Sequence, residues 1–373
     1  MKIYSDKTVL EAALDRIRFV FDEFPNVIVS FSGGKDSTTI LELALIVARE
    51  KNRLPLQVMF IDQEAEYQAT IDYVDEVMHR TEVKPYWLQC PIRLFNATSG
   101  ITHWLECWKE GDDWMREKSD ISIHENTFGE DRFKDMFTAF TKTMFPNTKT
   151  ASLGGVRCQE SPSRTVGLTN AMKYKYITWG KIESRKREHY VFYPIYDWEI
   201  SDIWKFIHDG KYNYNTIYDS FYQYGVPITK MRVSNLHHET AVWALFYLQE
   251  LEPETWRKLQ GRLAGVNTAG HLGLKDYFVG GADVPYMFAN RREYRDYLLD
   301  NLIVDPEAHE AFRKKFEKID IDYDGCPFME GLISAQINAI LANDSYMTKI
   351  NNSLNGPIVG AWHKYASRRR KGL

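Results

Sequence analysis

The sequence of 373 residues is poor in cysteine and lacks long hydrophobic runs. Its four cysteines are far apart and include no Cys-x-x-Cys pair, so no disulfide framework is predicted and no zinc or iron–sulfur site is expected. No run of about 18 apolar residues occurs, and the charged first ten residues lack an apolar signal segment. We therefore expect a soluble cytoplasmic protein with no membrane partner.

The sequence also lacks an excess of positive charge, since its formal net charge at pH 7 is −4. This balance argues against a protein that coats nucleic acid non-specifically. Two local basic segments, 181–187 and 368–371, are candidate contacts for nucleic acid. The plainer interpretations are a solvated charged face for the first segment and a solvated chain end for the second.

The most specific pattern is residues 27–37, a β-branched run followed by a glycine turn and an apolar segment. The run 27–31 predicts a buried parallel strand, and about 36–50 predicts a helix. This order directs backbone N–H groups and the positive end of the helix dipole at one point, where phosphate is stabilised. The loop is not a Walker A sequence, because Asp36 follows Lys35. An ordinary glycine turn is the alternative interpretation.

The predicted anion site combines backbone, hydroxyl groups and charge. Glycines let the backbone approach the anion, the lysine adds positive charge, and serines supply hydroxyls. We expect Lys35 and Asp36 to lie on an exposed loop, so that their replacement would leave the fold intact. The predicted nucleotide-binding residues of this stretch are Ser30, Ser32, Gly33, Gly34, Lys35, Asp36 and Ser37.

Strand and helix patterns alternate around this stretch. Such alternation predicts an α/β fold with a doubly wound parallel sheet, in which ligands bind beyond the carboxyl ends of the strands. Asp62 and Glu64 fall at that edge and are predicted to bind the nucleotide; Asp36 and Asp62 are the candidate Mg²⁺ ligands. The flanking predicted elements are a helix over 7–24, strands over 56–61 and 84–88, and a helix over 65–80.

A second motif follows a predicted strand at 152–156 and has the pattern Gly-x-Arg-x-x-Glu-Ser-x-x-Arg. Arg157 and Arg164 offer planar forks suited to phosphate or sulfate. If the strand belongs to the same parallel sheet, both arginines should share one anion with Lys35. The alternative is two surface arginines beside a helix that begins at Ser161. This motif adds Gly155, Arg157 and Arg164 to the predicted site.

Both motifs resemble those of the PP-loop ATP pyrophosphatases and phosphoadenosine phosphosulfate (PAPS) reductases. The run Tyr193–Trp198 resembles a further signature of that family, so the resemblance extends over about 25–210 in the family's order. It implies an adenine nucleotide alpha hydrolase-like fold, ATP or PAPS as the ligand, and Mg²⁺. The catalytic residues that it implies are Lys35, Asp36, Arg157 and Arg164.

Within that family the chain looks most like the IbrA/YbdN-like branch of bacteria and phages, which joins the loop domain to a C-terminal domain. This resemblance implies a ParB/sulfiredoxin-like partner protein. The reductases use a cysteine in a C-terminal Glu-Cys-Gly-Leu-His motif as their thiolate, and nothing like that motif occurs here. The late Cys326 lies in Asp-Gly-Cys-Pro, which does not match.

The predicted domains are a nucleotide-binding domain over 1–228, with a lid-like insertion over 91–150, and a mainly α-helical domain over 229–373 with a basic tail. His237-His238-Glu239 does not predict a metal site, because neighbouring helical residues point to different faces. The predicted helices of the second domain cover 239–251, 254–263, 291–302, 309–318 and 331–341.

Three functions remain open from the sequence. The first is cleavage of ATP between its α and β phosphates, which adenylates an unknown acceptor and releases pyrophosphate. The second is reduction of a sulfonucleotide such as PAPS. The third is a nucleotide sensor that acts through a partner without catalysis.

Overall fold

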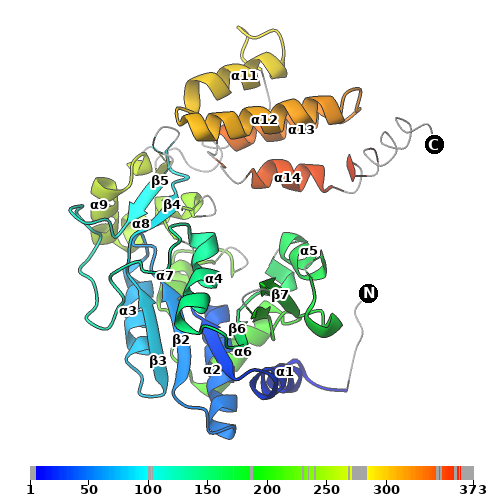
Figure 1. Cartoon of the computed structure of the whole chain (residues 1–373). Helices are drawn as coiled ribbons and strands as arrows, with labels where there is room; N and C mark the ends of the chain where they lie inside the picture. Colours follow the sequence, from blue (N-terminus) through cyan, green and yellow to red (C-terminus); the bar gives the residue numbers. More distant parts are fainter. Residues whose placement is uncertain are drawn as a thin grey trace. The chain divides into compact units, whose positions relative to one another are not determined.

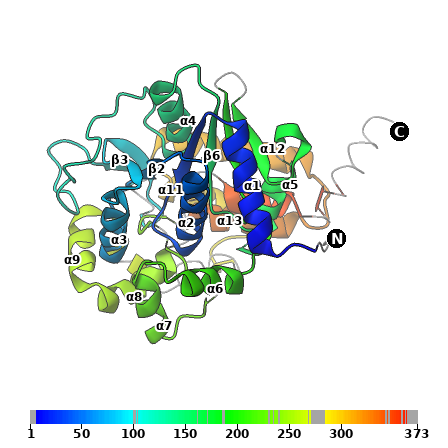
Figure 2. The same ribbon diagram turned by 90° about the horizontal axis from the view of Figure 1, so that it is seen from below.

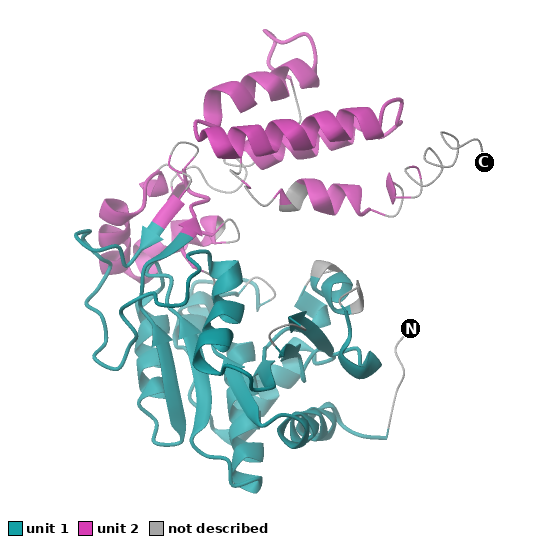
Figure 3. Ribbon diagram, viewed as in Figure 1, with its two compact units in different colours: residues 1–93, 106–233 teal, residues 94–105, 234–373 magenta. Residues whose placement is uncertain are grey.

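The computed structural model describes residues 6–99, 102, 104–160, 162–170, 172–184, 188–228, 231–233, 235–238, 241–267, 269–270, 284–341, 344, 347–356, 359–360 and 362. The chain divides into two compact units (Figure 3). The first consists of 1–93 and 106–233, and the second of 94–105 and 234–373. The proposed nucleic-acid contacts at 185–187 and 368–371 lie outside the described residues, while Lys181 forms an ion pair with Glu183 at 2.6 Å.

The first unit is built on a six-stranded sheet with the order β3-β2-β1-β6-β8-β7 (Figure 1). All neighbouring pairs are parallel except β7 and β8, which are antiparallel. The predicted doubly wound α/β fold is therefore confirmed, with β7 as an antiparallel edge strand whose direction the sequence pattern did not indicate. The strands are β1 (Asn26–Ser30), β2 (Leu56–Ile61), β3 (Val83–Leu88), β6 (Thr150–Leu153), β7 (Gly180–Ser184) and β8 (His189–Phe192).

Helices cover both faces of this sheet, and Figure 2 shows α2 and α4 on opposite sides of it. Alternate residues of each strand point to opposite faces, so Val27 and Val29 pack against one helical layer. The other face carries Tyr86, whose ring lies 5.1 Å from that of Phe140 on α4. The first layer is α1 (Val9–Glu23), α2 (Lys35–Glu50), α3 (Gln68–Met78) and α6 (Ile200–Gly210), and the second face holds α4 (Phe133–Met144).

The strand order places the carboxyl ends of β1 and β6 beside a change of winding direction. From β1 the chain proceeds outward through β2 to β3, whereas β6 pairs on the opposite side of β1. A parallel sheet opens a crevice at such a switch point. The predicted strand at 152–156 thus lies in the same sheet as β1, although it begins earlier and ends at Leu153.

The predicted insertion over 91–150 contains a two-stranded sheet of β4 (Ile92–Phe95) and β5 (Trp104–Cys107), followed by α4. The division between the two units falls within this small sheet. The remaining short elements of the first unit are η1 (Cys158–Glu160), α5 (Pro162–Asn170), η2 (Tyr174–Tyr176) and α7 (Ile217–Gln223).

The second unit is helical, as predicted. Its core includes Phe312, Phe316 and Ile337, and buried Arg295 donates to Gln336 at 2.7 Å. His237 contacts the Phe95 carbonyl through Nδ1 at 2.8 Å, and burial lowers the pKa of its imidazole to about 4. The helices are α8 (Val242–Leu251), α9 (Pro253–Arg262), α11 (Arg291–Leu302), α12 (Pro306–Asp322), α13 (Met329–Leu341) and α14 (Thr348–Leu354). Among the described residues, no helix is long and apolar enough to cross a membrane.

Candidate functional site

The glycine loop (residues 32–37) follows β1 at the switch point. Gly33 has φ +67°, and a Cβ there would lie 2.9 Å from Thr70 Cγ2, so the position requires glycine. Asn215 Nδ2 donates to the Gly33 carbonyl at 3.1 Å, and the Ser32 and Ser37 hydroxyls are 3.0 Å apart. The loop therefore has one fixed conformation, held from a segment far downstream.

The loop ends at the N-terminus of α2, where backbone N–H groups lack helical partners. The Lys35 N–H donates to the Tyr218 hydroxyl at 3.1 Å, and the Thr38 N–H to the Gly34 carbonyl at 2.9 Å. For the amides of Asp36 and Ser37 the structure records no hydrogen bond to a described residue. These two donors and the helix dipole suit an anion.

The charged residues of the site form a connected network. Lys35 Nζ lies 2.9 Å from one oxygen of Asp36, and Arg157 Nε donates to the other oxygen. Lys35 and Arg157 are 5% and 3% exposed. The prediction that Lys35 and Asp36 lie on an exposed loop is wrong. Both belong to the first turn of α2, the Asp36 side chain is 13% exposed, and the Lys35 ammonium packs over the Tyr218 ring.

The network stabilises the charged form of Asp36. Burial opposes ionisation of this carboxyl group, but the charges of Lys35 and Arg157 outweigh it and hold its pKa below the ordinary value. Asp36 therefore stays an anion between two buried cations. A phosphate at the same place would meet the same donors.

Arg164 joins the network through Glu160. It forms an ion pair with this glutamate, which also lies 3.7 Å from Arg157 Nη2. Burial, together with the charge of Asp36, raises the pKa of Glu160. The Arg164 side chain is 40% exposed. Lys35, Asp36, Arg157 and Arg164, predicted from motifs far apart in the sequence, thus belong to one connected group.

Gly155 brings the β6 side of the crevice against the loop. A Cβ on this residue would lie 2.8 Å from the Asp36 carbonyl carbon and 2.9 Å from the Ser37 nitrogen. These contacts are with backbone atoms, which cannot move aside as a flexible side chain can. Gly155 therefore permits the close approach of the two motifs.

Asp62 and Glu64 follow β2 but have different surroundings. Asp62 is fully buried and accepts from Trp87 Nε1 at 3.0 Å, as well as from Arg116. Glu64 accepts from the backbone N–H groups of Trp108 at 2.7 Å and Met115 at 3.2 Å. Both carboxylates thus hold the segment after β5 against the sheet. Their predicted role in nucleotide binding stays a prediction.

The carboxylates predicted to hold Mg²⁺ are engaged by donors of this chain. Both oxygens of Asp36 contact cations, and both oxygens of Asp62 accept hydrogen bonds. Mg²⁺ requires carboxylate oxygens that are free to enter an octahedral shell, so this arrangement does not fit a directly bound ion. Within the described part of the chain no group of three or more His, Cys, Asp or Glu is positioned for a metal.

Several residues of the site were not predicted from the sequence. Glu160 lies inside the second motif, so its identity was visible, but its link to Arg157 was not. Gln159 accepts from Arg157 Nη1 at 3.1 Å. Asn215 and Tyr218 contact the loop from a segment with no recognisable motif, and only the tertiary structure reveals their part.

All four cysteine thiols are free. Cys90 and Cys107 are buried in the first unit, and burial raises the pKa of Cys90 to about 11 and holds the pKa of Cys107 well above its ordinary value. Cys326 is buried in the helical core of the second unit. Cys158, which directly follows Arg157, is partly exposed.

Comparisons with known proteins match the chain to two families. Residues 26–224 match the phosphoadenosine phosphosulfate reductase domain, and 225–353 match a domain of unknown function (DUF3440). The uncharacterized protein YbdN of Escherichia coli (strain K12) is 29% identical over 327 residues, which are 84% of this chain and 80% of YbdN.

Other matches cover a smaller share of this chain. Sulfate adenylyltransferase subunit 2 of Mycolicibacterium vanbaalenii is 28% identical over 222 residues; the match spans 56% of this chain but only 63% of that protein. The solved structure of Candida glabrata FMN adenylyltransferase has a TM-score of 0.36 at 16% identity, covering 58% of this chain and 62% of that one. PAPS reductase from Candida auris has a TM-score of 0.35 at 14% identity, covering 64% and 98%. We draw no functional conclusion from these two structures.

The first family match includes the sheet, the glycine loop and the network from Lys35 to Arg164. It spans more than half of the chain, and the YbdN match continues through most of the helical unit. The chain therefore belongs to the phosphoadenosine phosphosulfate reductase domain family, and its predicted resemblance to YbdN is confirmed by the match over 84% of the chain.

Proposed function

We propose that this protein binds ATP at the glycine loop and cleaves it between the α and β phosphates, transferring the adenylyl group to an acceptor. One observation carries the proposal: Lys35, Arg157 and the N-terminus of α2 meet around the Asp36 carboxylate at the switch point of the sheet. This arrangement gathers positive charge where an anion of the size of phosphate can replace a carboxylate. The resemblance to a sulfate adenylyltransferase subunit supports adenylyl transfer.

The chain's own residues would act on the leaving group. As an acceptor oxygen attacks the α phosphorus, the bond to the β-phosphate oxygen breaks and negative charge gathers on pyrophosphate. Lys35 and Arg157 already lie in fixed positions, so they stabilise this charge without reorganising in the transition state. Asp36 has to yield these cations to the phosphate, which makes it a positioning residue before binding. Mg²⁺, which normally accompanies ATP, would neutralise phosphate charge.

Sulfonucleotide reduction is the second candidate function, because the matched family is named for it and Cys158 lies beside the site. A reductase needs a thiolate that attacks sulfur. Cys90 and Cys107 have raised pKa values, and burial makes them poor nucleophiles. Cys158, which directly follows Arg157, is the cysteine that such a reaction would use.

The test compares products from the full-length protein. Pyrophosphate and AMP or an adenylate are measured with ATP, alone and with sulfate as the acceptor probe, and sulfite is measured with PAPS and dithiothreitol. Pyrophosphate release that survives Cys158→Ser and is lost in Lys35→Met supports the proposal. Sulfite release that disappears in Cys158→Ser overturns it in favour of reduction.

The third candidate function, a non-catalytic nucleotide sensor, predicts a different result in the same assay. Such a protein would bind the ATP analogue AMPCPP tightly but release no pyrophosphate from ATP. We propose a ParB/sulfiredoxin-like protein as its partner and as a partner of the enzyme. Adding that partner while measuring pyrophosphate release distinguishes a sensor from an enzyme that the partner activates.

A further inference from the structure

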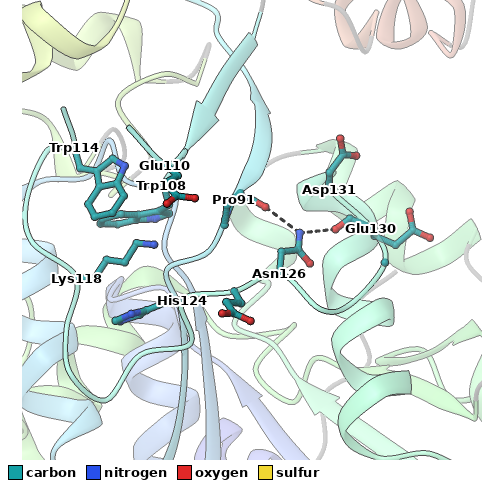
Figure 4. Close-up of a pocket in the computed structure, with 11 residues that line it drawn as sticks. Pro91, Trp108, Glu110, Trp114, Lys118, His124, Asn126, Glu130 and Asp131 are labelled. Atoms are coloured by element: carbon teal, nitrogen blue, oxygen red, sulfur yellow. Dashed lines mark hydrogen bonds between the residues drawn. The ribbon is translucent and has the colours of Figure 1, made fainter. Parts of the chain in front are cut away.

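A cavity of about 800 Å³ lies on the first unit, away from the glycine loop in sequence (Figure 4). Its lining residues all fall between positions 91 and 131, in the segment predicted as a lid-like insertion. This volume is within the range of small-molecule sites. None of the residues of the Lys35 to Arg164 network lines it.

One wall of the cavity is aromatic. The rings of Trp108 and Trp114 meet edge to face with centroids 5.8 Å apart, and Lys118 Nζ lies 4.4 Å from the Trp114 centroid. That distance is typical of a cation–π contact. Trp108 is fixed by its Nε1 hydrogen bond to the Asp62 carbonyl at 2.8 Å. The Trp114 face is therefore a cation site that the protein's own ammonium group occupies.

The opposite side is acidic, and Figure 4 shows Glu130 and Asp131 across the cavity from the two tryptophans. Asp131 is 3.6 Å from Arg93 Nε, whereas Glu110, Glu125 and Glu130 have no ion pair with any described residue. Four carboxylates against one ammonium leave the lining with a net charge of −3 when its histidine is neutral. The single ammonium group of Lys118 therefore does not neutralise the four carboxylates that line the cavity.

We propose that this cavity binds an aliphatic polyamine, with one ammonium group on the Trp114 face and the others toward the unpaired glutamates. An anion would meet net negative charge, and a bare metal ion would gain little from the indole face. The carboxylates are distributed around the cavity, so several separated ammonium groups satisfy them better than one compact cation. This site goes beyond the proposed function, because it requires no nucleotide.

Isothermal titration of the full-length protein with spermidine tests the proposal. Trp114→Ala should weaken spermidine binding about 10-fold, and Trp114→Phe should retain most of the affinity, because a phenyl face also binds cations. Glu125→Gln and Glu130→Gln should each weaken it about 3-fold. Glu117→Gln is the matched control, because Glu117 is exposed in the same segment but does not line the cavity.

Lys118→Met gives the sharpest result. Removing the competing ammonium group should strengthen spermidine binding about 3-fold, a gain that structural damage would not produce. Hexane-1,6-diol, a neutral chain of similar length, should not bind. Absent spermidine binding, equal affinity in Trp114→Ala and wild type, or complete displacement by an equal concentration of Mg²⁺ would each overturn the proposal.

Discussion

Asp36 and Asp62 both lie just beyond β-strands at the same edge of the sheet, yet their surroundings differ. Asp36 contacts two cations, Lys35 and Arg157, at the crevice between β1 and β6. Asp62 is enclosed by an indole, an amide, a backbone N–H and a guanidinium group. The partners of a carboxylate at this edge thus decide whether it pairs with the cations of the proposed anion site or holds the segment after β5 against the sheet.

The largest expected effect follows from removing the Asp62 carboxylate. Asp62→Ala leaves the Arg116 guanidinium partly buried without its carboxylate, so the free energy of unfolding should fall by about 3–5 kcal/mol. Urea denaturation followed by circular dichroism measures this change. Asp36→Asn, in contrast, should change AMPCPP affinity more than stability. Equal stability of Asp62→Ala and the wild type would show that Asp62 does not fasten the segment after β5.

Lys35→Met removes the ammonium group that pairs with Asp36 while keeping a side chain of similar length. Pyrophosphate release from ATP should fall about 100-fold or more, because a charge aimed at the leaving group is lost. The control is Lys51→Met, which removes a lysine at the other end of α2, paired with Asp22 at the surface. Wild-type turnover in Lys35→Met would exclude the loop as the phosphate site.

The two arginines of the network around Asp36, Arg157 and Arg164, should contribute unequally to nucleotide binding. Arg157→Ala should weaken AMPCPP binding by about 1.5–3 kcal/mol, the range for a charge-assisted hydrogen bond. Arg164→Ala should weaken AMPCPP binding less, because the Arg164 side chain is more exposed and pairs with Glu160. The Arg157→Ala and Lys35→Met effects should not add, since both groups act on one ligand. If the two effects add fully, Arg157 and Lys35 do not act on the same ligand.

The acidic cluster after β2 predicts a pH dependence. Burial and the charge of Asp62 raise the pKa of Glu66 to about 8, above its value in the unfolded chain, so the folded protein binds a proton more tightly. The wild type should therefore lose stability relative to Glu66→Gln as pH rises, by about 2 kcal/mol between about pH 6 and about pH 7.5. Urea unfolding of both proteins across this range measures it; Glu117→Gln serves as the exposed control. A constant difference would contradict the raised pKa.

The smallest effect concerns a cysteine remote from both carboxylates in the sequence. Cys326 lies in the helical core, and Cys326→Ser should lower stability by about 1 kcal/mol while pyrophosphate release per folded molecule stays unchanged. A loss of turnover in this variant, with the fold retained, would revive a thiol-dependent reaction for Cys326.

The sequence was sufficient to predict the elements that local patterns define. A β-branched run indicated β1, a short apolar run indicated β2, and the glycine turn with Lys35 indicated an anion site at the next helix. These features depend on residues adjacent in the chain. The pairing of β6 with β1 was not predicted, because the sequence offered a shared sheet only as a condition, and the structure supplies the pairing.

The sequence could not show which charges would be buried or satisfied. Nothing near Asp62 indicates that Trp87 and Arg116 donate to it, because those partners come from other segments. The antiparallel direction of edge strand β7 was also not predicted, since a strand pattern does not show which way its neighbour runs. Burial of Lys35 depends on Tyr218, 183 residues later in the chain.

The long separation of the loop from its supports bears on how the protein is made. Asn215 and Tyr218 bond to Gly33 and Lys35, residues that leave the ribosome far earlier. A nascent chain can contain β1, β2 and β3 while its loop still lacks both partners. The anion site is therefore expected to mature late in synthesis, once the chain to Tyr218 has emerged, and a chain terminated before Asn215 should bind AMPCPP poorly even where its strands have paired.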